Sequence, residues 1–192
     1  MRPETAVVEG ETVYRYKTIG STIDVARELS TKGASGIVVA ETQISGKGRY
    51  GRTWVSLPGG LYLSWIIPRM PERQRNLREM TAVAAVRTLT SFGLKGCGIK
   101  LPNDILIHDN KKIAGILIEQ NTNHCIISIG VNVNNNGREA GDRAASVRDV
   151  LGGPVNLDDF LAAFIREFRR ACDGHPGTVR SWREEWSSLL IK

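Results

Sequence analysis

The chain has 192 residues, of which 41% are hydrophobic, and it carries a formal net charge of +6. This length and apolar content suit one substantial core, so we expect a single domain over residues 1–192. No long apolar stretch follows the first residues, which argues against a signal peptide or a membrane span and predicts a cytoplasmic protein. The cysteines and histidines lack metal-ligand spacing, which disfavours a disulfide framework, a zinc site and histidine-based catalysis.

Apolar periodicity and turn residues predict both strands and helices along the chain. The expected strands cover residues 12–17, 37–41, 61–67, 97–100, 105–108, 112–119 and 125–133, the last of them adding an edge to the sheet. The expected helices cover residues 21–33, 76–92, 158–172 and 178–190, and Ser21 with Asp24 resembles a capping box at the start of the first. Short turns between consecutive strands require antiparallel pairing. The sequence therefore predicts an α/β (α+β) fold with a mixed, largely antiparallel sheet flanked by helices.

Residues 46–54 form a loop rich in glycine and cations, with the sequence Gly-Lys-Gly-Arg-Tyr-Gly-Arg-Thr-Trp. Its glycines would let the backbone approach an anion closely, and Lys47, Arg49 and Arg52 would neutralise that anion. The G-x-G-x-x-G match is weak by itself, because a dinucleotide fold needs a strand directly before the glycines and a helix directly after them. Pro58 and its neighbouring glycines prevent such a helix, and the chain has no kinase or Walker signature. The loop therefore predicts phosphate binding of another kind.

A second informative stretch carries two lysines on either side of a predicted strand. Lys100 precedes a Pro102-Asn103 turn, and Lys112 lies at the start of an apolar, β-branched run. This arrangement would bring the two ammonium groups to one end of a hairpin. A reacting carboxylate and a phosphate would fit there, so both stretches indicate an enzyme that handles phosphate.

The positive net charge also raises the hypothesis of nucleic-acid binding, because clustered cations gain free energy from counterion release. The cations of this chain are instead spread over the glycine loop, the region around Pro71 and the expected helix at 158–172. Few aromatic residues interleave with them, as a nucleic-acid platform would require. No helix-turn-helix precedes Ser21, since the first twenty residues predict a single strand. We therefore expect no nucleic-acid partner.

An ordered series of motifs resembles those of the biotin protein ligases, also called biotin–acetyl-CoA-carboxylase ligases. The series runs through Ser21-Thr22, Gln43 with the loop at 46–54, and the stretches 60–64, 100–104, 112–117 and 130–134. The resemblance implies the fold shared by biotin ligases, lipoate ligases and class II synthetases. It also implies an ATP-dependent enzyme that forms biotinyl-adenylate with the help of Mg²⁺. Biotin would then be transferred to a lysine of a biotin carboxyl carrier domain.

Correspondence with that family also implies roles for individual residues. The expected catalytic residues are Lys112, Arg49 and Lys100. Biotin binding is expected from Ser21, Thr22, Ile23, Gln43, Lys47, Gly48, Arg49, Lys112, Gly115 and Gly130. ATP binding is expected from Arg49, Arg52, Trp54, Asn103, Lys112, Ile116 and Asn132. No protein residue is assigned to the metal, and the chemistry needs charge neutralisation rather than a nucleophilic side chain, because two anions must meet.

The chain departs from the family pattern at several positions. Ile23 stands where Asn is usual, Leu101 where Trp is usual and Ser128 where Gly is usual. Lys47 replaces an Arg, which keeps the charge but loses the bidentate fork. The chain also ends after two helices, where many relatives add a small β-barrel, and a homodimer is compatible with the resemblance. Two alternatives stay open: a lipoate or octanoate ligase, which should lack this glycine loop, and a degenerate relative that binds biotin or nucleic acid without catalysis.

Overall fold

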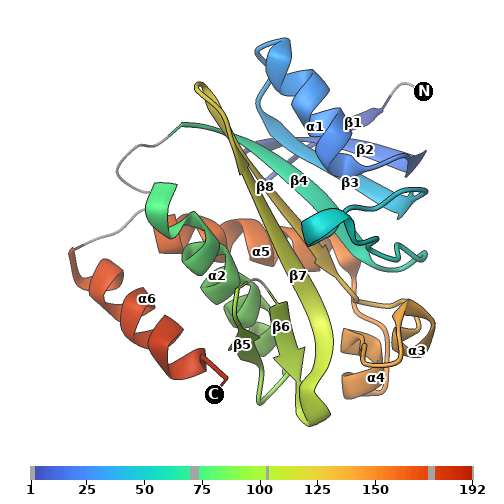
Figure 1. The fold of residues 1–192 in the computed structure, drawn as a ribbon, viewed down its shortest axis with the longest axis vertical. Coiled ribbons are helices and arrows are strands. Elements are labelled where there is room, and N and C mark those ends of the chain that lie inside the picture. The colour runs from blue at the N-terminus through green and yellow to red at the C-terminus, as the bar shows by residue number, and fades with distance from the viewer. Residues whose placement is uncertain (1–2, 70–73, 103, 173–175, 192) are drawn as a thin grey trace.

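Among the described residues, eight strands form one mixed sheet (Figure 1). The computed structural model describes residues 3–69, 74–102, 104–172 and 176–191. In the order in which they lie side by side, the strands are β1 (Glu4–Val8), β2 (Glu11–Ile19), β3 (Gly36–Gln43), β4 (Leu61–Pro68), β8 (His124–Val131), β7 (Lys111–Gln120), β6 (Asp104–Ile107) and β5 (Gly98–Lys100). The helices are α1 (Thr22–Thr31), α2 (Leu77–Ser91), α3 (Gly137–Ala140), α4 (Val147–Leu151), α5 (Leu157–Cys172) and α6 (Pro176–Leu189), with short 3-10 turns η1 (Arg49–Gly51), η2 (Gln74–Asn76) and η3 (His108–Asn110). Within these described ranges, no helix is both long and apolar enough to cross a membrane.

The pairing of the strands agrees with the predicted class. β2 and β3 run parallel, and α1 crosses between them, as a parallel connection requires. The other neighbouring strands of the described sheet pair antiparallel. The prediction of a mixed, largely antiparallel sheet flanked by helices is therefore confirmed.

Two predictions about the strands are wrong. Residues 4–8 form β1, which pairs with β2, although the first twenty residues predicted one strand at 12–17. A tight turn at Glu9 and Gly10, both with positive φ, joins these strands, and the glycine was the available signal. β8 lies between β4 and β7, inside the sheet rather than at an edge. Its unbroken apolar run at 125–127 is typical of a strand that is buried on both faces.

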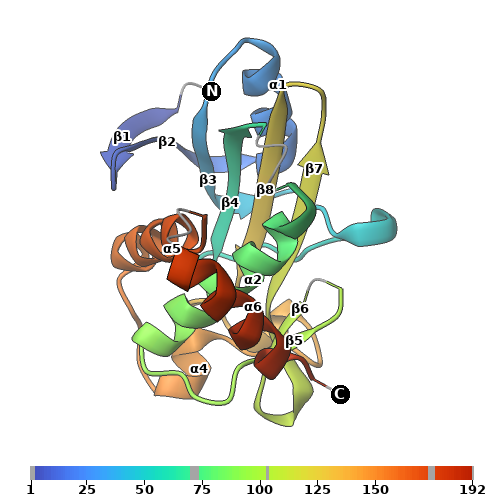
Figure 2. The same cartoon turned by 90° about the vertical axis from the view of Figure 1, so that its left-hand side faces the viewer.

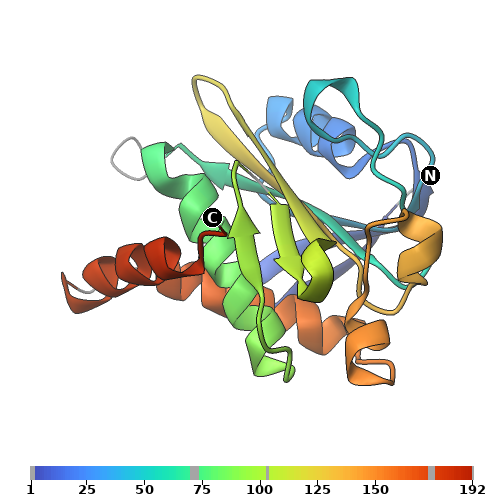
Figure 3. The ribbon, with the colours of Figure 1, turned by 60° about the horizontal axis from the view of Figure 1, so that its bottom comes forward.

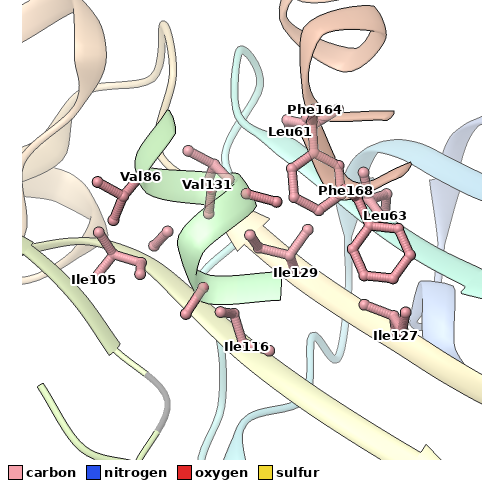
Figure 4. Close-up of a cluster of buried hydrophobic side chains, with 14 of the residues drawn as sticks. Leu61, Leu63, Val86, Ile105, Ile116, Ile127, Ile129, Val131, Phe164 and Phe168 are labelled. Carbon is pink, nitrogen blue, oxygen red and sulfur yellow. The ribbon is translucent and has the colours of Figure 1, made fainter. Parts of the chain in front are cut away.

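The main hydrophobic core lies between the sheet and helices α2, α5 and α6, which cover one face (Figure 2). Alternate residues of the central strands face these helices, and in β8 they are Ile127, Ile129 and Val131 (Figure 4). Phe164 and Phe168 of α5 pack on this surface, with their ring centroids 6.4 Å apart. This packing covers the central strands on that face of the sheet.

Helix α1 covers part of the opposite face through a smaller apolar cluster. The cluster consists of Ile23, Ala26, Val38, Ile66 and Ile126. The chain between β3 and β4 lies on the same side of the sheet as α1, as Figure 3 shows. Because α1 contacts β3, β4 and β8, the part of this face over β7 is left for a cavity.

The three cysteines pack as ordinary apolar side chains. Cys125 and Cys172 are buried in the core. Burial raises the pKa of the Cys97 thiol to about 11, so this group stays protonated at neutral pH. The prediction of buried thiols is confirmed for Cys125 and Cys172, whereas Cys97 is half-buried.

We predict that Phe164→Ala lowers the free energy of unfolding by about 3–5 kcal/mol, the usual cost of removing a buried aromatic side chain. Phe164 is 1% exposed and lies between α5 and the sheet. Chemical denaturation followed by circular dichroism measures the change. Val7→Ala, at a position that is 73% exposed, is the control and should change stability by no more than about 0.5 kcal/mol. Equal effects of the two substitutions would contradict this placement of the core.

Candidate active site

A cavity of about 310 Å³ opens on the face of the sheet that carries α1. Its walls come from the start of α1, the chain between β3 and β4, strands β7 and β8, and the end of β5 with the turn after it. Most of the predicted site residues line it: Ser21, Thr22, Ile23, Gln43, Lys47, Gly48, Arg49, Arg52, Trp54, Lys100, Lys112, Gly115, Ile116 and Gly130. A concave site with a few converging polar groups is typical of small-molecule binding.

Polar side chains form a wall of the cavity beside α1. The Thr22 backbone N–H donates to Gln43 Oε1 at 2.8 Å, and the Ser21 hydroxyl donates to the same oxygen at 3.4 Å. Gln43 Nε2 in turn donates to Ser56 Oγ at 2.8 Å. Because a backbone N–H can only donate, its contact decides which end of the Gln43 amide faces α1. Gln43 thus joins α1, β3 and the chain before β4 into one polar wall.

The hydrogen bonds determine what this polar wall can offer to a ligand. Ser21 has committed its single hydrogen to Gln43, so its oxygen can only accept another bond. The Gln43 oxygen already accepts two bonds, and its amide nitrogen keeps one hydrogen. A ligand group that combines a carbonyl oxygen with N–H donors, as an amide or a urea does, would satisfy these atoms together.

The expected capping box at the start of α1 is not formed. Ser21 is the N-cap residue, but its side chain makes no capping hydrogen bond because the hydroxyl is turned to Gln43. The Asp24 carboxylate accepts from Lys47 Nζ at 2.6 Å and also pairs with Arg27. Ser21 and Asp24, which resemble a capping box in the sequence, therefore contact the cavity wall and the glycine loop instead.

Lys100 and Lys112 both line the cavity, but not in the expected arrangement. Lys100 lies opposite Asp104 at one end of β6, whereas Lys112 lies opposite Leu106 near the other end. The Lys112 side chain spans this distance, and its Nζ is 2.7 Å from Asp104 Oδ1. The contact is an ion pair rather than a well-directed hydrogen bond. Lys112 therefore reaches the end of β6 where Lys100 lies through the length of its side chain, and not through its position in the strand.

The glycine-rich loop folds as a short hairpin. Lys47 and Thr53 form an antiparallel bridge, and the Trp54 N–H donates to the Gly46 carbonyl at 2.8 Å. A Cβ on Gly46 would lie 2.4 Å from the Trp54 carbonyl oxygen, so the two arms of the loop can meet only with glycine there. This closure brings the cations of the loop to the cavity.

The indole of Trp54 covers two facing glycines in the cavity. Gly115 of β7 and Gly130 of β8 are cross-strand partners. A Cβ on Gly130 would lie 2.5 Å from Trp54 Cε2, and a Cβ on Gly115 would lie 2.8 Å from Cζ3. These glycines were expected to let the backbone approach a ligand, and here they make room for the ring. Among the described residues, none accepts a hydrogen bond from the indole Nε1, which is buried against Gly130.

Two residues that were expected to bind ATP are not among the described walls. Asn132 is 2% exposed and does not line the cavity. Its Oδ1 accepts from Asn135 Nδ2 at 3.0 Å, so the side chain is held within the protein. Asn103 lies outside the described residues.

Sequence reasoning missed five residues that hold the site together: Asp24, Ser56, Ser64, Asp104 and Ser128. Asp104 directly follows the Pro-Asn turn, and its place between two lysines was an available signal. The serines had no local signal as partners, because their contacts depend on which strands and loops lie side by side.

The described residues contain no group of three or more His, Cys, Asp or Glu side chains that would hold a metal ion. Within the described lining of the cavity, the carboxylate is that of Asp104, which is engaged with Lys112. These side chains do not build a magnesium site of their own. A magnesium ion would need phosphate oxygens of a substrate as its main ligands.

We predict that Gly130→Ala displaces the Trp54 indole, because the new Cβ would collide with the ring. The expected result is stronger quenching of tryptophan fluorescence by acrylamide. In a Trp54→Phe background the same substitution should leave quenching unchanged, which separates this signal from the other tryptophans. Gly153→Ala is the control, since no atom lies within 4 Å of a Cβ there. Wild-type quenching in Gly130→Ala would argue against this position of the ring.

Residues 16–134 match the model of the Biotin/lipoate A/B protein ligase family. Over 180 residues the chain is 35% identical to the bifunctional ligase/repressor BirA of Bacillus spizizenii, and the match covers 84% of this chain and 55% of that protein. The chain therefore spans about half the length of the curated relatives it matches.

The fold is similar to those of solved biotin protein ligases. The Leishmania major enzyme in complex with biotin has a TM-score of 0.80 and 27% identity, over 94% of this chain and 81% of that one. The Aquifex aeolicus enzyme in complex with biotin and ATP has a TM-score of 0.78 and 25% identity, over 93% and 78%. The expected likeness to the biotin ligase fold is confirmed. Because the family model matches more than half of the chain, the chain belongs to the Biotin/lipoate A/B protein ligase family.

Proposed function

We propose that the protein is an ATP-dependent biotin protein ligase that attaches biotin to a lysine of a biotin carboxyl carrier domain. The observation that carries this proposal is the combination, in one cavity, of a polar wall suited to a urea with cations suited to a carboxylate and a phosphate. Biotin has a cyclic urea at one end and a carboxylate at the other. The names of the relatives and the biotin held by the structural neighbours support the same substrate.

In the first step, an oxygen of the biotin carboxylate attacks the α-phosphorus of ATP. The bond from that phosphorus to the bridging oxygen of the β-phosphate breaks, and the products are biotinyl-adenylate and pyrophosphate. No proton is transferred, so the protein must mainly neutralise two anions that meet. The Lys112 ammonium can exchange Asp104 for a substrate oxygen, and Arg49 and Lys100 add positive charge from two other walls.

In the second step, the amine of the carrier lysine attacks the carbonyl carbon of the mixed anhydride. The carbon–oxygen bond to the phosphate breaks, AMP leaves, and the nitrogen loses a proton to give an amide. The carrier domain is therefore the protein partner of the proposed reaction, and a homodimer is compatible with it. We expect Mg²⁺ to bind the phosphates of ATP. Neither step above depends on a metal ion that is held by the protein.

Lipoate and octanoate are the competing substrates, because the family includes lipoate ligases. Neither acid carries a urea or an amide at the end remote from its carboxylate. Either would leave Ser21, Thr22 and Gln43 without ligand partners, at a cost of roughly 1–3 kcal/mol for each polar group that becomes buried and unsatisfied. The polar wall therefore favours biotin.

Lys112→Ala is expected to lower the rate of adenylate formation by about a hundredfold or more, because a cation is lost from the reacting centre. Biotin-dependent exchange between ATP and labelled pyrophosphate measures this rate. Lys111→Ala is the matched control, since Lys111 is the adjacent, exposed lysine and does not line the cavity. Near-normal exchange in Lys112→Ala, with the fold checked by circular dichroism, would remove this residue from the mechanism.

Arg49→Gly is expected to make adenylate but to release it about tenfold faster or more, as the loss of a charged hydrogen bond suggests. Released mixed anhydride would then label lysines of an unrelated protein in the same tube. Arg49→Lys keeps the positive charge but lacks the planar guanidinium, which can donate two parallel hydrogen bonds. Its adenylate off-rate should therefore lie between those of Arg49→Gly and the wild type. Bystander labelling and the adenylate off-rate are followed together. An unchanged off-rate without bystander labelling, while synthesis is intact, would exclude this retaining role.

A further inference from the structure

Three hydroxyl groups, those of Thr22, Ser64 and Ser128, are joined by hydrogen bonds beside the polar wall, and we call them the hydroxyl relay. Ser64 Oγ donates to Thr22 Oγ1 at 2.9 Å, and Ser64 Oγ lies 2.8 Å from Ser128 Oγ. The three residues come from β4, α1 and β8, so the relay crosses from the sheet to the helix. Ser64 is 0% exposed, whereas Thr22 and Ser128 both line the cavity.

The number of hydrogens determines the direction of the relay. A serine hydroxyl has one hydrogen to donate, and Ser64 uses its hydrogen toward Thr22. The bond between Ser64 and Ser128 must therefore be donated by Ser128. Thr22 receives a hydrogen bond on its oxygen, and among the described residues no acceptor takes its own hydrogen. Because Thr22 lines the cavity, this hydrogen is available to a ligand there.

We propose that Ser128 and Ser64 are positioning residues that hold the Thr22 hydroxyl as a hydrogen-bond donor toward the carbonyl oxygen of the substrate's urea. This inference rests on the proposed function and adds residues that touch or lie behind its recognition end. Hydroxyls that donate in one direction polarise each other, so each link strengthens the donor at the end of the line. If each hydroxyl of the relay donated in the opposite direction, the free hydrogen would lie on Ser128 and not on Thr22.

The relay predicts discrimination between a hydrogen-bond acceptor and a donor at one atom of the ligand. In 2-iminobiotin an NH group replaces the ureido oxygen, and the protonated form can only donate at that position. Biotin presents an acceptor to Thr22, whereas protonated 2-iminobiotin presents a second donor. Wild-type protein should therefore bind biotin more tightly, and much of this preference should depend on Ser64 and Ser128.

The experiment measures binding of biotin and of 2-iminobiotin by calorimetry, without ATP and at a pH where 2-iminobiotin is protonated. Ser64→Ala is expected to weaken biotin binding about tenfold and Ser128→Ala about fivefold, in line with the loss of a hydrogen bond. Binding of protonated 2-iminobiotin should stay nearly unchanged in both variants. Ser128→Thr keeps the hydroxyl and should restore the preference for biotin.

Thr42→Ala is the matched control. It removes one hydroxyl of another hydrogen-bonded pair, Thr18 and Thr42 at 2.8 Å, that lies outside the cavity. Neither ligand should bind differently to this variant. In pyrophosphate exchange, Ser128→Ala should raise the KM for biotin and leave kcat unchanged, a split that general loss of structure would not produce.

The outcomes separate the relay from the proposed function. Equal weakening of both ligands by Ser64→Ala and Ser128→Ala, or an unchanged ratio of their affinities, would overturn the relay. Wild-type protein that binds neither ligand would overturn the proposed function and the relay with it. If Ser64→Ala fails to fold, Ser128→Ala still decides, because Ser128 lies at the cavity surface and is only partly buried.

Discussion

The register of three antiparallel strands determines which side chains face the cavity. Ser64 of β4 lies opposite Ser128 of β8, and Gly130 of β8 lies opposite Tyr62 on one side and Gly115 on the other. Side chains alternate between the faces of a sheet, so a shift of one residue would turn this whole set toward the helices. The apolar residues on the other face hold the register through their packing against α2 and α5. The site therefore depends on the same packing that stabilises the fold.

Two lysines of the site are held by acids of the protein itself. Lys47 pairs with Asp24 at 2.6 Å, and Lys112 pairs with Asp104 at 2.7 Å. The lysine side chains are 42% and 34% exposed, and ion pairs of this kind contribute little net stability. An anionic ligand can therefore replace the acid at small cost. Each acid still serves the site, because it keeps its lysine directed to the cavity before the ligand arrives.

The polar wall and the glycine loop belong to one hydrogen-bond network. Gln43 donates to Ser56, and the Ser56 hydroxyl donates to the Trp54 carbonyl at 3.2 Å. The Trp54 backbone N–H also donates to the Gly46 carbonyl on the other arm of the loop. These hydrogen bonds connect Gln43 of the polar wall to the segment that carries the Trp54 indole.

The sequence by itself determined the class of the fold, most of its helices and strands, and most of the side chains that line the cavity. Those features depend on local periodicity, turn residues and short motifs, which a single chain displays directly. The tertiary structure alone decided the central place of β8, the pairing of Ser64 with Ser128, the ion pair of Lys112 with Asp104, and the position of Trp54 over its glycines. Local periodicity says which face of a strand is apolar, but strand order and register come from packing between distant segments.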